Sequence, residues 1–101
     1  MTQDLVIGID SSTSATKAIA WDRSGRAVAE GRKAIGLANP HPGYFEQNPD
    51  DWWDAAAAAL RSITDQVDAR RIAAVAISNQ RETFSAFTED GAAIRPGMTW
   101  L

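Results

Sequence analysis

Hydroxyl side chains fill a short turn that follows a carboxylate near the start of the chain. Asp10 ends the apolar run 5–9, residues 11–14 are Ser-Ser-Thr-Ser, and Lys17 comes three positions later. A carboxylate can hold Mg²⁺ directly or through water, hydroxyls and turn N–H groups can surround phosphate oxygens, and a lysine can offset developing negative charge. The pattern predicts a site for a metal-bound phosphate. Its residues would be Asp10 as the metal ligand, together with Ser12, Thr13, Ser14 and Lys17.

The same turn has a simpler interpretation. Serine and threonine hydroxyls often satisfy backbone groups in tight turns, and such a hairpin turn needs no ligand. The turn also differs from the P-loop of many nucleotide-binding proteins, because no Gly-Lys-Thr opens a helix here. On residue types alone, the phosphate site and the plain hairpin turn both stay open.

A second candidate is the segment Gln80-Arg81-Glu82-Thr83, which follows an apolar run at 72–78. Arginine only donates hydrogen bonds and an ionised glutamate only accepts them, so the pair could recognise several hydroxyls of one polyol. The alternative is a surface ion pair worth under about 1 kcal/mol. Neighbouring residues in an extended chain point to opposite faces, which argues against a joint site.

Aromatic residues give weaker signals. Trp100 could form a flat wall against the C–H face of a carbohydrate, or it could belong to the core. We expect Trp53 to be a core residue and Trp52 to contact a loop. His41 lies between two prolines, with no cysteine or second histidine in the chain, so we do not expect it to bind a metal. The stretch 46–49 is interpreted as the entry to a helix.

The strands that must position these residues are expected early in the chain. Residues 5–10 are apolar on both faces, as in the centre of a buried sheet. Residues 15–22 alternate between two faces, a turn follows at 22–25, and residues 26–35 form a third strand. Three strands in succession predict an antiparallel meander.

A helix is the clearest element of the second half. Residues 38–49 are expected to be a loop, since two prolines and a glycine interrupt them. Asn48 can then cap the helix, with Pro49 at its first position and two aspartates complementing its dipole. Its expected apolar face is formed by Trp53, Ala56, Leu60, Ile63 and Val67.

The remaining pattern predicts a second buried strand at 72–78 and then a hairpin, 84–88 with 94–100, around a turn at 89–91. The order β-β-β-α-β-β-β indicates an α/β domain with a mixed sheet. No closing helix precedes Leu101, so we expect the 101 residues to be an incomplete domain.

Composition excludes several classes of protein. The net charge is −3 with a sequence pI of about 4.9, which disfavours a nucleic-acid partner. No segment approaches the roughly 20 apolar residues that span a bilayer, and the first residues have neither the basic start nor the small-residue cleavage site of a signal peptide. There is no cysteine. We therefore expect a cytoplasmic protein with no membrane or nucleic-acid partner.

Four segments together resemble the FGGY family of carbohydrate kinases, which includes glycerol kinase, xylulokinase and gluconate kinase. The resemblance spans essentially the whole chain, and each segment alone is a weak signal. The segments are Gly8-Ile9-Asp10-Ser11-Ser12-Thr13-Ser14 with Lys17, Pro42-Gly43-Tyr44-Phe45-Glu46-Gln47-Asn48-Pro49 with Trp52-Trp53, Ile77-Ser78-Asn79-Gln80-Arg81-Glu82-Thr83, and Pro96-Gly97-Met98-Thr99-Trp100.

The resemblance implies a fold of two ribonuclease-H-like lobes, as in sugar kinases, Hsp70 and actin, with ATP and substrate in the cleft. Residues 1–101 would form the N-terminal part of the first lobe, and the second lobe would be absent. The turn 10–17 would wrap the nucleotide phosphates and Mg²⁺. The substrate residues would be Gln80, Arg81, Glu82 and Trp100.

Three further expectations follow from the resemblance. The Arg-Glu pair is typical of glycerol kinase, whereas xylulokinase-like members more often carry Met-His, so the segment leans toward polyol recognition. The family often has glycine where Ser12 stands, which would strain Ser12 if that position needs positive φ. The catalytic base, an aspartate in this family, is expected beyond Leu101, so residues 1–101 hold no catalytic residue.

These features predict an ATP-dependent sugar or polyol kinase, with the 101 residues alone inactive and a homodimer an open option for the full-length protein. One alternative is a non-catalytic sugar-binding or degenerate protein of the same fold. Another is a ribonuclease-H-type nuclease, which needs a carboxylate cluster for two metals. The run 72–78 ends in Ser78-Asn79 rather than an aspartate, which disfavours the nuclease.

Overall fold

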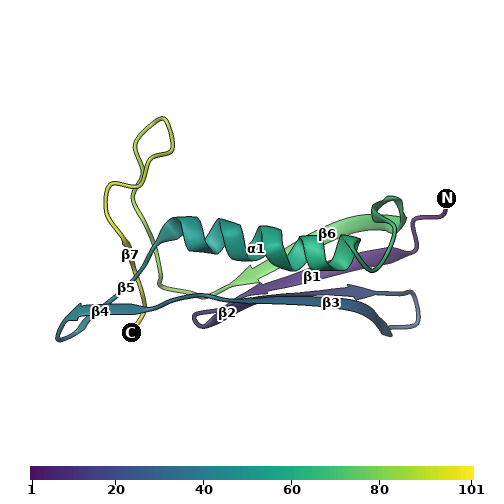
Figure 1. The fold of residues 1–101 in the computed structure, drawn as a ribbon, viewed down its shortest axis with the longest axis horizontal. Coiled ribbons are helices and arrows are strands. Elements are labelled where there is room, and N and C mark those ends of the chain that lie inside the picture. Colours follow the sequence, from purple (N-terminus) through teal and green to yellow (C-terminus); the bar gives the residue numbers. More distant parts are fainter.

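The computed structural model describes residues 1–101, in which one long helix lies across a four-stranded sheet and a small three-stranded sheet lies beyond one end of it (Figure 1). The elements in chain order are β1 (Leu5–Ser11), β2 (Ala15–Trp21), β3 (Ala27–Ala34), β4 (Ala38–His41), β5 (Tyr44–Gln47), α1 (Pro49–Thr64), the 3₁₀ turn η1 (Ala69–Arg71), β6 (Ile72–Asn79) and β7 (Gly97–Met98). The structure is α/β, with strands of both directions.

The larger sheet has the strand order β3-β2-β1-β6. The β1–β2 and β2–β3 pairs are antiparallel, as the expected meander requires, while β6 runs parallel to β1 after the α1 crossover. Asp10 is in register with Ser78 and Ser11 with Asn79. The carboxyl ends of β1 and β6 therefore meet at one edge, and the two polar segments that follow them lie together.

The start of α1 forms as its sequence predicts. The Asn48 side chain accepts a hydrogen bond from the Asp50 N–H at 3.0 Å, and Pro49 occupies the first turn. The core lies between this helix and the sheet. Its buried members are Ile7, Ile9, Ala18, Ala20, Ala29, Ala59 and Ile63.

The buried face of α1 differs from the expected one. Ala55, Ala59 and Ile63 face the sheet at four-residue steps, whereas Trp53 is 75% exposed, so the prediction of a core role for Trp53 was wrong. Small side chains on this face let the helix approach the sheet closely. Trp52, expected to contact a loop, has its ring against the backbone of Gly97, which belongs to strand β7.

The prediction that 72–78 is buried was also wrong. Seven of the eight residues of β6 are exposed, and Val75 and Ile77 are 53% and 64% exposed. Helix α1 packs mainly over β2 and β3, so it leaves β6 at an uncovered edge. β1 is central in the sheet but covered only on the face toward α1, and Val6 and Asp10 on its other face are exposed.

The expected loop at 38–49 instead contains a hairpin. β4 and β5 pair antiparallel, with His41 opposite Tyr44. Pro42 and Gly43 are the two central residues of the turn, and Gly43 has φ of 80°, which suits a type II turn. β4 is an edge strand, so the proline within it removes no hydrogen bond that the sheet needs.

The expected hairpin at 84–100 is only partly formed. Isolated bridges join Phe84 to Met98 and Phe87 to Ala93, and Gly91 takes φ of 87° in the turn. β7 pairs with β5 rather than continuing this ladder. The segment projects away from the helix and sheet in Figure 1, and both phenylalanines are about half exposed, so no apolar face holds it as a regular hairpin.

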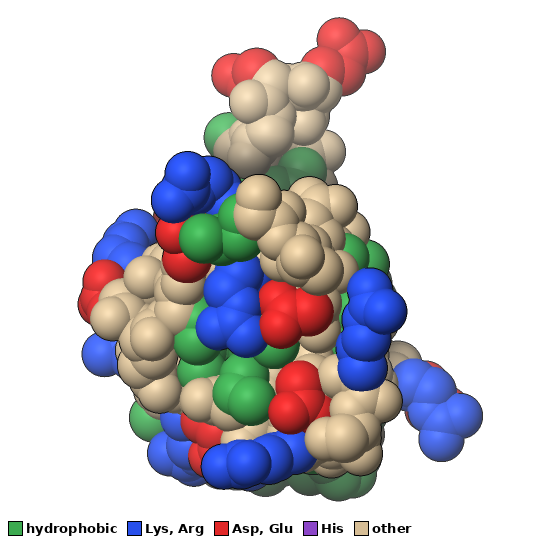
Figure 2. Space-filling view, turned by 90° about the vertical axis from the view of Figure 1, so that its right-hand side faces the viewer, with side chains coloured by type: hydrophobic (Ala, Val, Ile, Leu, Met, Phe, Trp, Pro, Cys, Tyr) green, Lys and Arg blue, Asp and Glu red, His purple; other side chains and the backbone are tan.

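No helix of the structure is long and apolar enough to cross a membrane. On the end of the molecule shown in Figure 2, acidic and basic side chains are interspersed and neither sign dominates.

Candidate functional site

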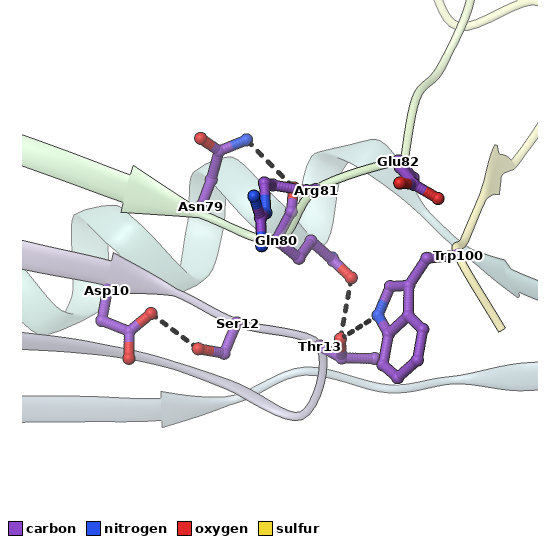
Figure 3. A pocket seen from close by; sticks show the side chains of 8 residues that line it. All are labelled: Asp10, Ser12, Thr13, Asn79, Gln80, Arg81, Glu82 and Trp100. Carbon is purple, nitrogen blue, oxygen red and sulfur yellow. Dashed lines mark hydrogen bonds between the residues drawn. The ribbon is translucent and has the colours of Figure 1, made fainter.

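A cavity of about 500 Å³ opens at the edge where β1 and β6 end (Figure 3). Segments that are distant in sequence meet here. The cavity is lined by the turn after β1, by the segment after β6 and by Trp100. Its lining residues are Asp10, Ser12, Thr13, Asn79, Gln80, Arg81, Glu82 and Trp100. Seven of these eight were expected to be site residues; Asn79 was not.

The turn after β1 is held by its own polar groups. The Ser12 Oγ donates to Asp10 Oδ1 at 2.6 Å, and the Ser12 N–H donates to the Ala15 carbonyl at 3.0 Å. Ser12 does not have positive φ, so the strain considered for that position is absent. Ser12 therefore serves the turn in the way of an ordinary hairpin and still presents its hydroxyl to the cavity.

The donor set around Asp10 suits a hydrated divalent cation. One carboxylate oxygen accepts from Ser12, and the other accepts no hydrogen bond from the protein. No group of three or more His, Cys, Asp or Glu side chains gathers anywhere in residues 1–101. Mg²⁺ bound by few protein ligands keeps several waters, so one carboxylate fits it, whereas the carboxylate cluster of a two-metal nuclease is not formed here.

The backbone conformation at Glu82 allows Arg81 and Glu82 to line the same cavity, although neighbouring residues of an extended chain point to opposite faces. The ladder between β1 and β6 extends one residue further, through the Gln80 N–H and the Ser11 carbonyl at 2.9 Å. Glu82 then takes φ of 55°, the only non-glycine residue with positive φ. Arg81 and Glu82 both line the cavity. They form no ion pair with each other, so the surface-pair alternative is wrong.

Trp100 is a wall of the cavity rather than a core residue. It is 54% exposed, and its Nε1–H donates to Thr13 Oγ1 at 2.8 Å. The preceding residue is fixed on β5, because the N–H and Oγ1 of Thr99 both donate to the Phe45 carbonyl, at 3.0 and 2.9 Å. The indole is thereby held against the turn that carries the other candidate residues, as Figure 3 shows.

Two of the expected phosphate-side residues lie outside the cavity lining. Lys17 is the cross-strand partner of Asp10, exposed on the sheet face opposite α1. Ser14 is exposed, and its carbonyl accepts from the Ile35 N–H at 2.9 Å. Of the expected phosphate-side residues, Asp10, Ser12 and Thr13 line the cavity. Ser14 and Lys17 lie beside it.

Gln47 is the polar residue that the sequence interpretation missed. It was assigned only to a helix entry, yet it is 2% exposed and its side chain makes four hydrogen bonds. Its partners come from positions 5 to 34 residues away, so no local spacing pattern could reveal them. Asn79 could have been found, because it precedes Gln80 at the end of the same strand.

The N-terminal domain of the FGGY family of carbohydrate kinases matches residues 5–101. The chain belongs to this family. Among its relatives, the glycerol kinase of Thermococcus gammatolerans is 32% identical over 94% of the chain, and the xylulose kinase of Escherichia coli is 30% identical over 95%. Each match covers 20% of the relative, so the chain spans about a fifth of the length of the curated relatives it matches.

Solved structures of FGGY kinases share the fold. The ligand-bound xylulose kinase of Lactobacillus acidophilus superposes with a TM-score of 0.88 at 30% identity, over 95% of this chain and 19% of that one. The gluconate kinase of the same organism gives a TM-score of 0.84 at 30% identity, over 95% of this chain and 20% of that one. The expected ribonuclease-H-like, α/β fold with a mixed sheet is confirmed.

Proposed function

We propose that residues 1–101 supply the acceptor wall and one phosphate-binding turn of an ATP-dependent carbohydrate or polyol kinase. The observation that carries the proposal is that one cavity joins the turn after Asp10 to Arg81, Glu82 and Trp100. A kinase must bring an acceptor hydroxyl and a phosphoryl group together, and its catalysis depends mostly on that positioning and on charge stabilisation.

Three side chains suit the acceptor. The Arg81 guanidinium can donate to acceptor oxygens, and the Glu82 carboxylate can accept from hydroxyls, so the pair recognises hydroxyl groups in both senses. The Trp100 indole offers a flat apolar surface to the C–H groups between them. Neither charged side chain is held in an ion pair, so both are available to a ligand. The acceptor class we propose is a small polyol or sugar.

The turn suits the phosphate side. Mg²⁺·ATP, when bound, would supply the phosphoryl group and part of the charge that stabilises its transfer. Asp10 would hold the cation through its unpartnered carboxylate oxygen, and Ser12 would orient that carboxylate. Ser14 remains a proposed phosphate-side residue, and Thr13 is proposed to act there through its backbone N–H, because its hydroxyl proton is donated to Gln80. Lys17 beside Asp10 would reduce the local negative charge. The base that takes the hydroxyl proton is proposed to lie outside residues 1–101.

Substitution of Arg81 tests the proposal in the full-length protein. Arg81→Ala should lower kcat/KM for the acceptor by about 100-fold, since a hydrogen bond to a charged group contributes about 1.5–3 kcal/mol. The KM for ATP should change by less than about twofold. Steady-state ADP release, measured with each substrate varied in turn, provides both values. Arg61→Ala, at an exposed position on α1, is the matched control.

Two outcomes would contradict the proposal. Equal losses for acceptor and ATP would show that Arg81 does not belong to the acceptor wall. Acceptor binding without ADP release in the unsubstituted protein would favour the non-catalytic, sugar-binding alternative.

A further inference from the structure

The buried amide of Gln47 links three segments that are distant in sequence. Its Nε2 donates to the carbonyl oxygens of Thr13 at 2.6 Å and Gly36 at 3.2 Å. Its Oε1 accepts from Trp52 Nε1 and from Gln80 Nε2, each at 2.9 Å. Every polar atom of the amide is therefore used inside the protein.

The direction of these hydrogen bonds is fixed by chemistry. An indole N–H only donates and a backbone carbonyl only accepts, so Trp52 and the two carbonyls allow one orientation of the Gln47 amide. Gln80 must then present its NH₂ group to Gln47. Its Oε1 is left to accept from the hydroxyls of Thr13 at 2.9 Å and Thr83 at 3.2 Å.

The chain of hydrogen bonds ends at the cavity wall. Thr13 Oγ1 donates its single proton to Gln80 and accepts from Trp100 Nε1 at 2.8 Å. The same hydroxyl therefore cannot also donate to a ligand in this arrangement. The dashed lines in Figure 3 show this last part of the chain, from Gln80 through Thr13 to Trp100.

We propose that Gln47 is a positioning residue, which sets where Gln80 and Trp100 stand in the cavity wall without touching the ligand itself. The identification of the ligand as the acceptor rests on the function proposed above. The relay, meaning the hydrogen bonds that lead from Gln47 through Gln80 and Thr13 to Trp100, does not depend on that function. Buried polar networks of this kind hold their members rigidly only while each donor and acceptor is satisfied. One incorrect group at Gln47 should therefore displace Trp100, at the far end of this chain of hydrogen bonds.

Gln47→Glu is the sharpest test, because it keeps the size of the side chain and replaces the NH₂ donor with a carboxyl oxygen. When ionised, the new carboxyl group has no hydrogen for the carbonyls of Thr13 and Gly36, and when protonated it has one hydrogen for the two of them. The matched control is Glu46→Gln, the reverse exchange at the preceding residue of β5, where the ion pair with Arg95 lies outside this network.

Indole resonances report the displacement directly. In the full-length protein labelled with ¹⁵N-tryptophan, each indole signal is assigned by its Trp→Phe variant. Gln47→Glu should shift the signals of Trp52 and Trp100, while Trp21 and Trp53, which donate no hydrogen bond, serve as internal references. Glu46→Gln should move none of the four. A shift of Trp52 with Trp100 unchanged would overturn the positioning role.

A second variant covers the case in which Gln47→Glu does not fold. Thr13→Val removes the hydroxyl between Gln80 and Trp100, so Trp100 should shift while Trp52 keeps its signal. Thr13→Ser, which retains the hydroxyl, should restore the Trp100 signal. If Thr13→Val leaves the Trp100 signal in place, the relay does not exist.

Kinetics then separate this inference from the proposed function. Gln47→Glu should raise the KM for the acceptor about tenfold, the effect of one hydrogen bond, and leave the KM for ATP within about twofold. If Trp100 shifts and neither KM changes, the positioning role stands and the assignment of the cavity to the acceptor is overturned. If both KM values rise equally, the role specific to the acceptor wall is overturned.

Discussion

Glu82 shows how one backbone angle can create a site. A left-handed conformation costs a residue with a side chain about 1–2 kcal/mol, and Glu82 is the one such residue among the 101. Without that turn, Arg81 and Glu82 would alternate across an extended strand. With it, both line the cavity. The local strain therefore has a defined consequence, a donor and an acceptor side by side.

Two substitutions of Glu82 distinguish the effect of backbone strain at this residue from the effect of losing its carboxylate. Glu82→Gly and Glu82→Ala both remove the carboxylate, but only glycine relaxes the left-handed angle. We expect the glycine variant to be more stable than the alanine variant by about 1 kcal/mol, measured by denaturant unfolding. Both should lose acceptor affinity to the same extent. Equal stabilities would show that the angle at Glu82 is not strained.

Local chemistry explains which site residues could be predicted. Asp10 near the end of β1 and Ser12 and Thr13 in the turn after it lie within four positions of the sequence, and their types alone suggested a phosphate site. Gln47 gave no such signal, because its role depends on Thr13 and Gln80, which are 34 and 33 residues away in sequence. Sequence patterns identify what a segment can bind more readily than what holds that segment in place.

At the scale of elements, a glycine in β3 sets how closely the helix lies on the sheet. Gly31 is buried, and a side chain there would overlap the Ala59 carbonyl of α1 and crowd Ser62. The alanines on this face of α1 suit the same close approach. Since the capping residue of α1, Asn48, directly follows Gln47, the position of the helix also affects the segment that supports the cavity.

Gly31→Ala tests this contact. The added methyl group should push the helix off the sheet and lower the free energy of unfolding by about 2 kcal/mol, the usual cost of overpacking. Gly36→Ala is the matched control, since nothing lies within 4 Å of a methyl group there. Thermal unfolding of the two variants provides the comparison. Equal stability would show that the helix–sheet distance adjusts freely.

The elements that were predicted correctly are those with local signals. α1 has a cap, a first-turn proline and acidic first-turn residues, and β1 to β3 have alternating or apolar runs. The β4–β5 hairpin was missed because its prolines suggested a loop. Pro40 is tolerated because β4 is an edge strand, and Pro42 because it lies in the turn. The exposure of β6 was missed because its apolar sequence does not tell where the helix packs.

At the scale of the whole molecule, we expect aspartates that accept hydrogen bonds in the folded state to contribute to the loss of stability in acid. Asp68 accepts from the backbone and side chain of Arg70, which lowers its pKa to about 2 from an ordinary 3.8. The guanidinium of Arg71 lowers the pKa of Asp4 and joins the start of β1 to the start of β6. Hydrogen bonds from Ser24 likewise lower the pKa of Asp22.

These shifts predict acid destabilisation. The native state holds the carboxylates deprotonated to lower pH than the unfolded chain, so their contribution is present above pH 3.8 and is lost as pH falls toward about 2. Melting temperatures between pH 5 and pH 2 should fall most steeply in that window. Asp68→Asn should flatten part of the fall, whereas Asp54→Asn, an exposed residue of α1 outside any ion pair, should not. An unchanged slope in Asp68→Asn would contradict this assignment.

The short strand β5 has a consequence for how the protein can vary in length. Its Phe45 carbonyl anchors Thr99, next to Trp100, and two residues later Gln47 anchors Thr13 and Gln80. Inserting or deleting one residue between these positions would turn one anchor to the opposite side of the strand. Exchanges of single side chains in β5 can leave the spacing of the anchors intact. An insertion or a deletion cannot, so among variants of this protein a change of length near β5 should fall in the β4–β5 turn rather than between Phe45 and Gln47.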